Sequence, residues 1–447
     1  MINLRLNVNY YLPKYQNSIE KLRNANRGRL HKISDFADVV CGPFGSAIKN
    51  GDYLSEGIPL LRITNISPDG VLDYGDLKFI SEKLSEKLHN NQVSCGDIVI
   101  SQRGSLGLCA IVDDRYRTLN ISANLIAIKN IKGHSPEFIR NFLNSSICKD
   151  FLAKAQSGQI QSKINTSDIS EIPIPFGLDE VSLNLFISKE YEKYISKKQQ
   201  ADELLASVNE FIDEKLGCCK LSTSPQMCVG ICFEHLNTAR LDANFYRSRH
   251  SVSHKSSFEM CNLGEIAFIN DNSKKIASQD NMVPYVGLPD CSKSEIEQVV
   301  VKRYSDVSGR NIAFPNDILF ARIEPSIFNK KYVWAGDLLG HDYAFLSTEF
   351  YTIRSKNPLL QRFIYAMLFY QPVYQQFFGM TTGSTGRRRL DKNSLSQISI
   401  PVPGVDICVE IGNEFFARRK KAKTQKQEAE KEWQNAREQF EKELLGE

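Results

Sequence analysis

The chain has 447 residues, of which 42% are hydrophobic and 24% charged, with a formal net charge of +4. This length exceeds what one hydrophobic core usually holds, so we expect at least two domains of ordinary globular composition. The sequence lacks the long apolar run of a membrane span and the basic and apolar regions of a secretion signal. Eleven scattered cysteines are typical of reduced thiols in a cytoplasmic protein. The small positive charge permits nucleic-acid binding without requiring it.

The first module extends from about residue 30 to residue 178 and alternates short apolar segments with turn signals. Segments 58–63, 97–100 and 110–112 are rich in β-branched residues, which predicts strands. Residues 136–155 carry apolar side chains at helical spacing, and Pro173 and Pro175 then close the module, because proline interrupts both strand ladders and helices.

Two segments predict long helices that pack along another helix. Residues 179–216 and 404–445 have apolar or small residues at steps of four and three, which is a heptad pattern. Gly217 and Gly446 follow the two segments, as expected for helix C-terminal glycines. Two independent surface helices are the alternative, but each seam needs a partner, so we expect the two helices to pack on each other. The seam residues are Ile187, Tyr191, Tyr194, Ala201, Leu205, Val208 and Ile212, interrupted by Lys198, and Ile411, Phe415, Ala422, Ala429, Ala436 and Phe440.

The second module spans about residues 262–404, after a connector at 218–238 that could add a strand to it. Its helical segment 359–378 is rich in aromatic residues. They could form a base-stacking platform, but packing in the core of a small helical subdomain is the favoured interpretation.

The two modules are copies of one framework. Residues 5–11 recur as 240–246, residues 33–37 as 263–267, residues 96–99 as 316–319, and residues 172–175 as 400–403, in the same order. The loops between these segments differ, and residues 42–46 have no clear counterpart. A shared scaffold with unlike loops favours two binding modules with different targets over two copies of one catalytic site.

Catalytic motifs are missing from the sequence. There is no Asn-Pro-Pro-Tyr-type tetrapeptide for adenine methylation, no phosphate-binding Gly-x-x-x-x-Gly-Lys-Ser/Thr loop and no His-Glu-x-x-His zinc motif. Cys218, Cys219, Cys228 and Cys232 lack the spacing of zinc knuckles. We therefore expect no catalytic residue, no metal site and no cofactor in this chain.

Two polar loops at matching places in the modules, residues 156–163 and 381–389, are the candidates for DNA contact, because Gln, Ser, Thr, Lys and Arg bind phosphates and base edges. A solvated turn of similar composition is the alternative for both loops. Arg103 and Arg322, which follow the repeated Asp-Ile strand, could contact guanine or could pair with Asp97 and Asp317, and the two possibilities have equal weight. With residues of segment 58–66, the candidates are Arg62, Asn65, Arg103, Gln159, Gln161 and Lys163 in the first module, and Arg322, Thr382, Ser384, Thr385, Arg387, Arg388 and Arg389 in the second.

The ordered set of motifs resembles the specificity subunit of type I restriction–modification systems. The motifs are Arg-Leu-Asp-x-x-Phe-Tyr at 240–246, Pro-Phe-Gly-Ser at 43–46, residues 58–66, residues 96–104 and Ile-Pro-Ile-Pro at 172–175. The resemblance implies two tandem α/β (mixed α+β) target-recognition domains separated by two long antiparallel coiled-coil helices. It also implies a bipartite DNA site whose spacer the helices fix.

The same resemblance implies partner subunits that carry the chemistry. Two modification subunits would methylate adenine with S-adenosylmethionine, and restriction subunits would use ATP and magnesium. The expected boundaries are 1–178 for the first recognition domain with its N-terminal segment, 179–217 for the central helix, 218–403 for the connector and second recognition domain, and 404–447 for the C-terminal helix. A protein-interaction scaffold and an unrecognised DNA-modifying enzyme remain as alternatives.

Two features depart from the family pattern. The second module lacks the Pro-Phe-Gly-Ser and Arg-Gly-Ser-Leu-Gly signatures, so contact residues cannot be transferred to it from the family. The C-terminal helix is also strongly charged between residues 418 and 431, which suggests an exposed surface or a face for a partner.

Overall fold

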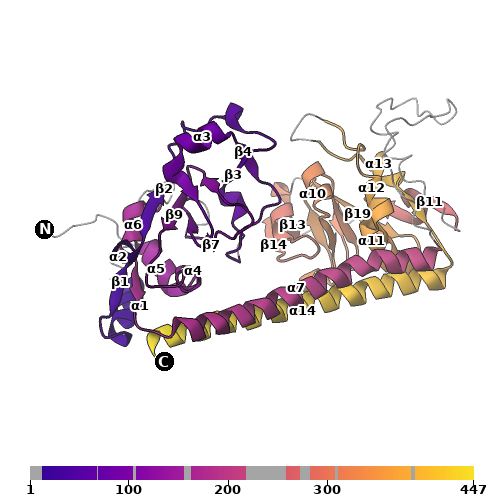
Figure 1. The fold of residues 1–447 in the computed structure, drawn as a ribbon. Helices are drawn as coiled ribbons and strands as arrows, with labels where there is room; N and C mark the ends of the chain where they lie inside the picture. Colours follow the sequence, from indigo (N-terminus) through magenta and orange to yellow (C-terminus); the bar gives the residue numbers. More distant parts are fainter. Residues whose placement is uncertain are drawn as a thin grey trace. The chain divides into compact units, whose positions relative to one another are not determined.

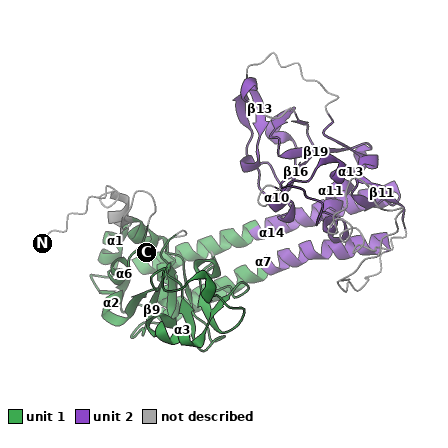
Figure 2. Ribbon diagram, turned by 90° about the horizontal axis from the view of Figure 1, so that it is seen from above, with its two compact units in different colours: residues 1–197, 427–447 green, residues 198–426 purple. Residues whose placement is uncertain are grey.

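The computed structural model describes residues 13–67, 69–103, 107–155, 163–217, 258–271, 282–307, 311–383 and 388–447. The chain forms two compact units, residues 1–197 with 427–447 and residues 198–426, which are coloured separately in Figure 2. Among the helices of the described part, none is long and apolar enough to cross a membrane. Gln159, Gln161, Ser384, Thr385, Arg387 and the connector lie outside the described residues.

Two four-stranded sheets form the centre of the first unit. The first sheet is fully antiparallel, in the order β2 (Asp38–Cys41), β9 (Leu125–Lys129), β6 (Ile98–Ser101) and β7 (Cys109–Ile111). The second has the order β4 (Lys78–Ile80), β3 (Ile58–Leu61), β8 (Leu119–Ile121) and β5 (Gln92–Val93), with β3 and β8 parallel. Among the helices of this part are α1 (Pro13–Ala25), α3 (Glu82–Lys87), α4 (Pro136–Leu143), α5 (Ser146–Ala155) and α6 (Thr166–Ser170).

Strand β6 is buried on both faces, because its side chains alternate between two hydrophobic clusters. Ile98 and Ile100 pack with Phe138 and Phe142 of α4, whereas Val99 points into the cluster shared with the second sheet. Full burial of one such side chain stabilises the fold by about 1.5–3 kcal/mol. This alternation explains why Ile98, Val99 and Ile100 are all apolar.

The second unit repeats the topology of the first. Its sheets have the orders β12 (Ala267–Ile269), β19 (Phe350–Ser355), β16 (Ile318–Ala321), β17 (Tyr332–Trp334), and β14 (Val300–Arg303), β13 (Met282–Val286), β18 (Ala344–Leu346), β15 (Ile312–Ala313). Again only the pair β13–β18 is parallel in these described sheets. Helices α10 (Glu324–Phe328), α11 (Gln361–Phe369), α12 (Gln371–Gln375) and α13 (Lys392–Ser396) complete the module (Figure 1). The predicted internal repeat is confirmed in the described strands, and the repeated segments 5–11 and 240–246 lie outside the described residues.

The repeated Ile-Pro segments also have equivalent positions. Strand β1 (Leu30–Lys32) pairs with β10 (Pro173–Pro175), and β11 (Met260–Asn262) pairs with β20 (Ser399–Pro401), both antiparallel. Each first strand runs into a four-residue helix, α2 (Ile33–Phe36) or α9 (Leu263–Ile266). The Lys32 and Asn262 amides donate to Asp35 and Glu265, each at 2.8 Å, so the same turn holds both copies. The described 3₁₀ helices are Asn50–Asp52, Ile63–Asn65, His89–Asn91, Leu288–Asp290, Tyr304–Asp306, Leu338–Gly340 and Pro358–Leu360.

The aromatic residues of segment 359–378 form core, as the favoured interpretation predicted. Phe363, Tyr365, Tyr370 and Phe377 are at most 2% exposed and share one cluster with α14. Phe378, at 43% exposure, is the exception among the aromatic residues of this segment. Their arrangement leaves no stacking platform along α11.

The two long helices are α7 (Glu180–Leu216) and α14 (Val405–Leu445). In the second unit, residues Asp202, Ser207 and Lys215 of α7 contact Lys426, Arg418 and Glu410 of α14, so the helices are antiparallel there. In the first unit, Tyr194 contacts Glu430, and Ile187 shares a cluster with Phe440, which gives the same direction. All six predicted seam residues of α14 are at most 5% exposed. Gly217 and Gly446 have φ values of 62° and 68°, which confirms the predicted helix ends.

Candidate nucleic-acid interface

The strand register defines which residues of the two modules are equivalent. Ser101 pairs with Leu125 in the first module, and Ala321 pairs with Phe350 in the second. One residue further on, the Gln102 amide donates to the Asn124 carbonyl at 2.9 Å, and the Arg322 amide donates to the Glu349 carbonyl at 3.0 Å. Arg322 is therefore equivalent to Gln102. Arg103, which the repeat in the sequence places near Arg322, lies one position further along the chain than the equivalent residue.

A third segment joins the same place in each module. The Ile164 amide donates to the Gln102 carbonyl at 3.2 Å, and the Leu390 amide donates to the Arg322 carbonyl at 2.9 Å. Lys163 and Arg389 precede these residues and are equivalent. We call each set of three side chains a polar junction. The first junction consists of Gln102, Asn124 and Lys163, and the second consists of Arg322, Glu349 and Arg389.

In the second polar junction, the Glu349–Arg389 pair is bidentate. Arg389 Nε and Nη2 donate to the two carboxylate oxygens of Glu349 at 2.9 and 2.6 Å. These charged hydrogen bonds from Arg389 hold the pKa of Glu349 below its ordinary value. The Arg322 guanidinium lies over the Tyr351 ring, 5.1 Å from its centroid, at a distance typical of a cation–π contact.

Other predicted residues of the second module lie beside this junction. Arg388 is 3.4 Å from the carboxylate of Glu324 and donates to the Thr381 carbonyl at 2.9 Å. Thr382 is exposed, and its amide and carbonyl pair with those of Arg389 at 2.9 Å. The structure thus brings Arg322, Thr382, Arg388 and Arg389 together. The run of arginines favours a phosphate contact in this module, and in the structure Arg388 and Arg389 are each paired with a glutamate.

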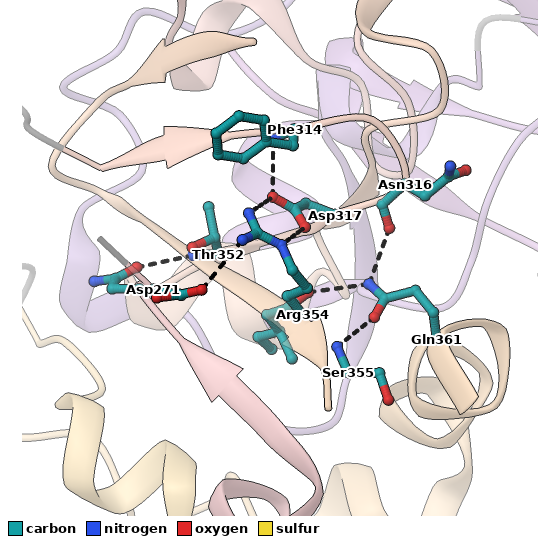
Figure 3. A network of polar contacts seen from close by, with 10 residues as sticks. Asp271, Phe314, Asn316, Asp317, Thr352, Arg354, Ser355 and Gln361 are labelled. Atoms are coloured by element: carbon teal, nitrogen blue, oxygen red, sulfur yellow. Dashed lines mark hydrogen bonds and ion pairs between the residues drawn. The ribbon is translucent and has the colours of Figure 1, made fainter. Parts of the chain in front are cut away.

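The structure excludes the proposed ion pair between Arg322 and Asp317. Asp317 is bound by Arg354, whose Nε and Nη2 donate at 2.8 and 2.6 Å, and the Phe314 amide donates to the same carboxylate at 2.8 Å. Figure 3 shows this network together with Asp271, which lies 3.3 Å from Arg354. Because Arg354 binds both carboxylate oxygens of Asp317, Asp317 stabilises the sheet and does not orient Arg322.

The matching ion pair in the first module is also absent. Asp97 accepts the Ser94 amide at 2.9 Å, and burial raises the pKa of this carboxyl, an effect that nearby Lys129 partly offsets. Arg103 is exposed and makes no hydrogen bond or ion pair with any described residue. No described residue uses the Arg103 donors, and Arg103 lies one position beyond the polar junction.

The first polar junction has a different chemical character from the second. Gln102 is 3% exposed and lies 3.5 Å from the Cys41 sulfur, whereas Asn124 is exposed and Lys163 is half-buried. The junction carries one cation and two amides where the second carries two guanidinium groups and a carboxylate. One backbone frame therefore presents two unlike sets of hydrogen-bonding groups.

Phe44 is a candidate contact residue that the sequence interpretation did not select. It is 88% exposed, which is unusual for a large apolar side chain on a monomer surface. The preceding Gly42 packs so closely on the β8–β9 turn that an added Cβ would lie 2.0 Å from the Ser122 carbonyl oxygen. The Gly42 amide also donates to Leu125 at 2.8 Å. The glycine-proline pair before Phe44 was the sequence signal for this fixed, exposed loop.

Arg62 and Asn65 have structural partners in the first module. Asn65 is 1% exposed, accepts the Arg62 amide at 2.9 Å and donates to the Asp73 carbonyl at 3.0 Å. The second module has the same turn, in which Asp290 accepts the Gly287 amide at 2.8 Å. Asn65 is thus a turn-forming residue, and its selection as a DNA contact is corrected. Arg62 is bound to the carbonyl and carboxylate of Asp76 at 2.8 and 2.9 Å.

Comparison with known proteins identifies the family of this chain. The family model for the type I restriction modification DNA specificity domain matches residues 30–181 and 255–430, once on each module. These two regions include most of the sequence. The chain belongs to this family. Specificity subunits of type I systems are not catalytic, and this chain is a specificity component. Within the described residues, no group of three or more His, Cys, Asp or Glu side chains could hold a metal ion.

Individual relatives are distant. The specificity subunit of the type I restriction enzyme EcoBI from Escherichia coli is 24% identical over 165 residues, which are 36% of this chain and 34% of that protein. The match therefore spans about a third of the curated relative. A chain from a structure on assembly and conformational transition of a type I system has a TM-score of 0.49 at 12% identity, covering 93% of this chain and 96% of its own length. The S subunit of a type I system from M. genitalium has a TM-score of 0.42 at 14% identity, and the match covers 93% of this chain and 95% of that subunit.

Proposed function

We propose that this chain recognises a bipartite, asymmetric DNA sequence, with one half-site bound by each module. The observation that supports the proposal is the pair of polar junctions. The strand order and main-chain hydrogen bonds are the same in both modules, but equivalent positions carry Gln102, Asn124 and Lys163 or Arg322, Glu349 and Arg389. Selection for one shared ligand would favour similar groups at these positions. Two different base sequences require different donors and acceptors.

The proposal extends to the two long helices. Helix α7 continues from residues of the first unit into residues of the second without a break, and α14 does the same in reverse. An α-helix rises about 1.5 Å per residue and resists bending. A pair of such helices would fix the number of unspecified base pairs between the half-sites.

The proposal also includes the partners. In this function two modification subunits bind the chain and methylate adenine, and restriction subunits join them for translocation and cleavage. Support comes from the family, whose members supply specificity and no catalysis. The strongly charged surface of α14 between residues 418 and 431 offers a polar face for such a partner.

The test is to map adenine methylation by single-molecule sequencing in a host that carries this gene with its modification gene. A bipartite methylated motif that disappears on deletion of this gene would support the proposal and give both half-sites and the spacer. If the modification subunit is expressed and the deletion changes nothing, the proposal fails and a protein-interaction scaffold becomes the better explanation. Methylation of DNA by the purified chain alone would also contradict it.

A further inference from the structure

The Arg322 side chain has donors for which no described residue is an acceptor. A guanidinium group offers five N–H donors in a rigid fork. The Nε of Arg322 is buried and has no partner, and the remainder of the guanidinium makes no hydrogen bond or ion pair to any residue that the structure describes. Leaving a buried donor unpaired costs about 1–3 kcal/mol. The residue therefore does not contribute to the fold as Arg354 does.

Neighbouring residues hold Arg322 in place without using its donors. The Tyr351 ring beneath the guanidinium is 6% exposed, and its hydroxyl donates to the Leu390 carbonyl at 3.2 Å. Arg322 lies near enough to the Glu349 carboxylate to help lower its pKa, but Arg389 binds both oxygens of that carboxylate. The Tyr351 ring and the main-chain hydrogen bonds to Glu349 and Leu390 thus position Arg322, and no described residue accepts from its side-chain donors.

A positioned arginine fork whose donors no described residue uses suits a ligand with two adjacent acceptors. Two adjacent acceptors in a plane, such as O6 and N7 of guanine in the major groove, match the spacing of the guanidinium N–H groups. A phosphate also accepts two such bonds, but it carries no sequence information. The equivalent residue of the first module is Gln102, and an amide in this place cannot form the same pair of donations to guanine. The two modules therefore differ, at this position, in the hydrogen bonds that they can donate to a base.

We propose that Arg322 recognises a guanine in the half-site of the second module, positioned by Tyr351 and by the Glu349–Arg389 pair. This inference rests on the proposed DNA-recognition function and names the residue and base through which it acts. Arg322 is the specificity-determining group, and Glu349, Tyr351 and Arg389 are positioning residues.

The experiment uses the full chain co-purified with its modification subunit and a DNA library in which both half-sites are randomised. R322K keeps the charge and loses the fork, so discrimination for one G·C pair should fall by roughly 5- to 150-fold, the range of a bidentate base contact. Preference at the first half-site should remain that of the unaltered protein. R303A, which removes an exposed arginine on β14 of the same module, is the control and should leave all base preferences unchanged.

The outcomes separate this inference from the proposed function. If the unaltered complex selects a bipartite site and R322K weakens binding uniformly without changing any base preference, Arg322 is a phosphate contact and the inference is overturned. Loss of preference at both half-sites would equally overturn it, since a structural defect would then be the cause. If the unaltered complex shows no site preference, the proposed function itself fails. A Y351A variant that reproduces the R322K preference at the same base pair would support the positioning role of Tyr351.

Discussion

Arg389 and Glu349 bind each other through two parallel hydrogen bonds of 2.9 and 2.6 Å. Arg389 lies on the segment that returns to the junction, and Glu349 directly precedes strand β19. The pair therefore links these two segments of the second module at the second polar junction. Because the Arg389 side chain is 40% exposed, water screens part of this interaction.

The first prediction concerns the pH dependence of this pair. Arg389 lowers the pKa of Glu349 in the folded state, so the stabilisation is complete above the unfolded pKa of about 4.3 and is lost as the pH falls through the folded value. E349Q should lower the free energy of unfolding by about 1 kcal/mol at pH 7. The difference should shrink below about pH 4.5. Urea unfolding at both pH values measures it, with E297Q, an exposed carboxylate on the same module, as control.

A second prediction compares equivalent aspartates of the two modules. Asp317 is 1% exposed, and both of its carboxylate oxygens accept from Arg354. D317N replaces one of these oxygens with an amide group that cannot accept, so we expect the free energy of unfolding to fall by about 3 kcal/mol. Burial raises the pKa of Asp97, so its charged form opposes folding. We therefore expect D97N to lower the free energy of unfolding by less than about 1 kcal/mol.

The measurement uses the two tryptophans of the chain, Trp334 in one unit and Trp433 in the other. Fluorescence of W433F and W334F backgrounds therefore follows each unit separately. Equal losses for the two variants would refute this difference.

The third prediction concerns the junction of α7 with the first module. Glu180, in the first turn of α7, accepts from His134 at 2.5 Å and from the Ser135 amide at 2.8 Å. The His134 side chain is 1% exposed, so E180A would leave a buried imidazole without its acceptor. We expect a loss of about 2 kcal/mol in the unfolding free energy of the first unit, measured by Trp433 fluorescence. E192A, at an exposed position of the same helix, should change it little.

The architecture was predictable from the sequence because periodicity and repetition are local signals. Heptads such as Ile411, Phe415 and Ala422 specify a helix and its buried face before any partner is known, and these residues are buried as expected. The polar junctions were not predictable at residue level. Their equivalence depends on cross-strand hydrogen bonds, and a shift of one position separates Gln102 from Arg103. Asn65 was misassigned because asparagine serves equally in turns and in base recognition.

The fourth prediction tests whether the helices fix the spacer. Within the first unit, Tyr194 contacts Glu430, so points beside residues 194 and 430 lie at the same level of the antiparallel pair. Inserting seven residues at each point adds one heptad to both helices and preserves the buried seam. Each helix lengthens by about 10 Å, which corresponds to roughly three base pairs at 3.4 Å each. The methylated motif should keep both half-sites and gain a spacer longer by that amount.

The control for this prediction is the same insertion in α7 alone. It shifts the α7 seam against an unchanged α14, so the heptad partners no longer match along the full length. We expect this variant to lose thermal stability and methylation together, whereas the double insertion retains the stability of the original protein. A double-insertion variant that is stable and still methylates sites with the original spacer would show that the helices do not set the spacing, because their length would then have changed without consequence for the DNA.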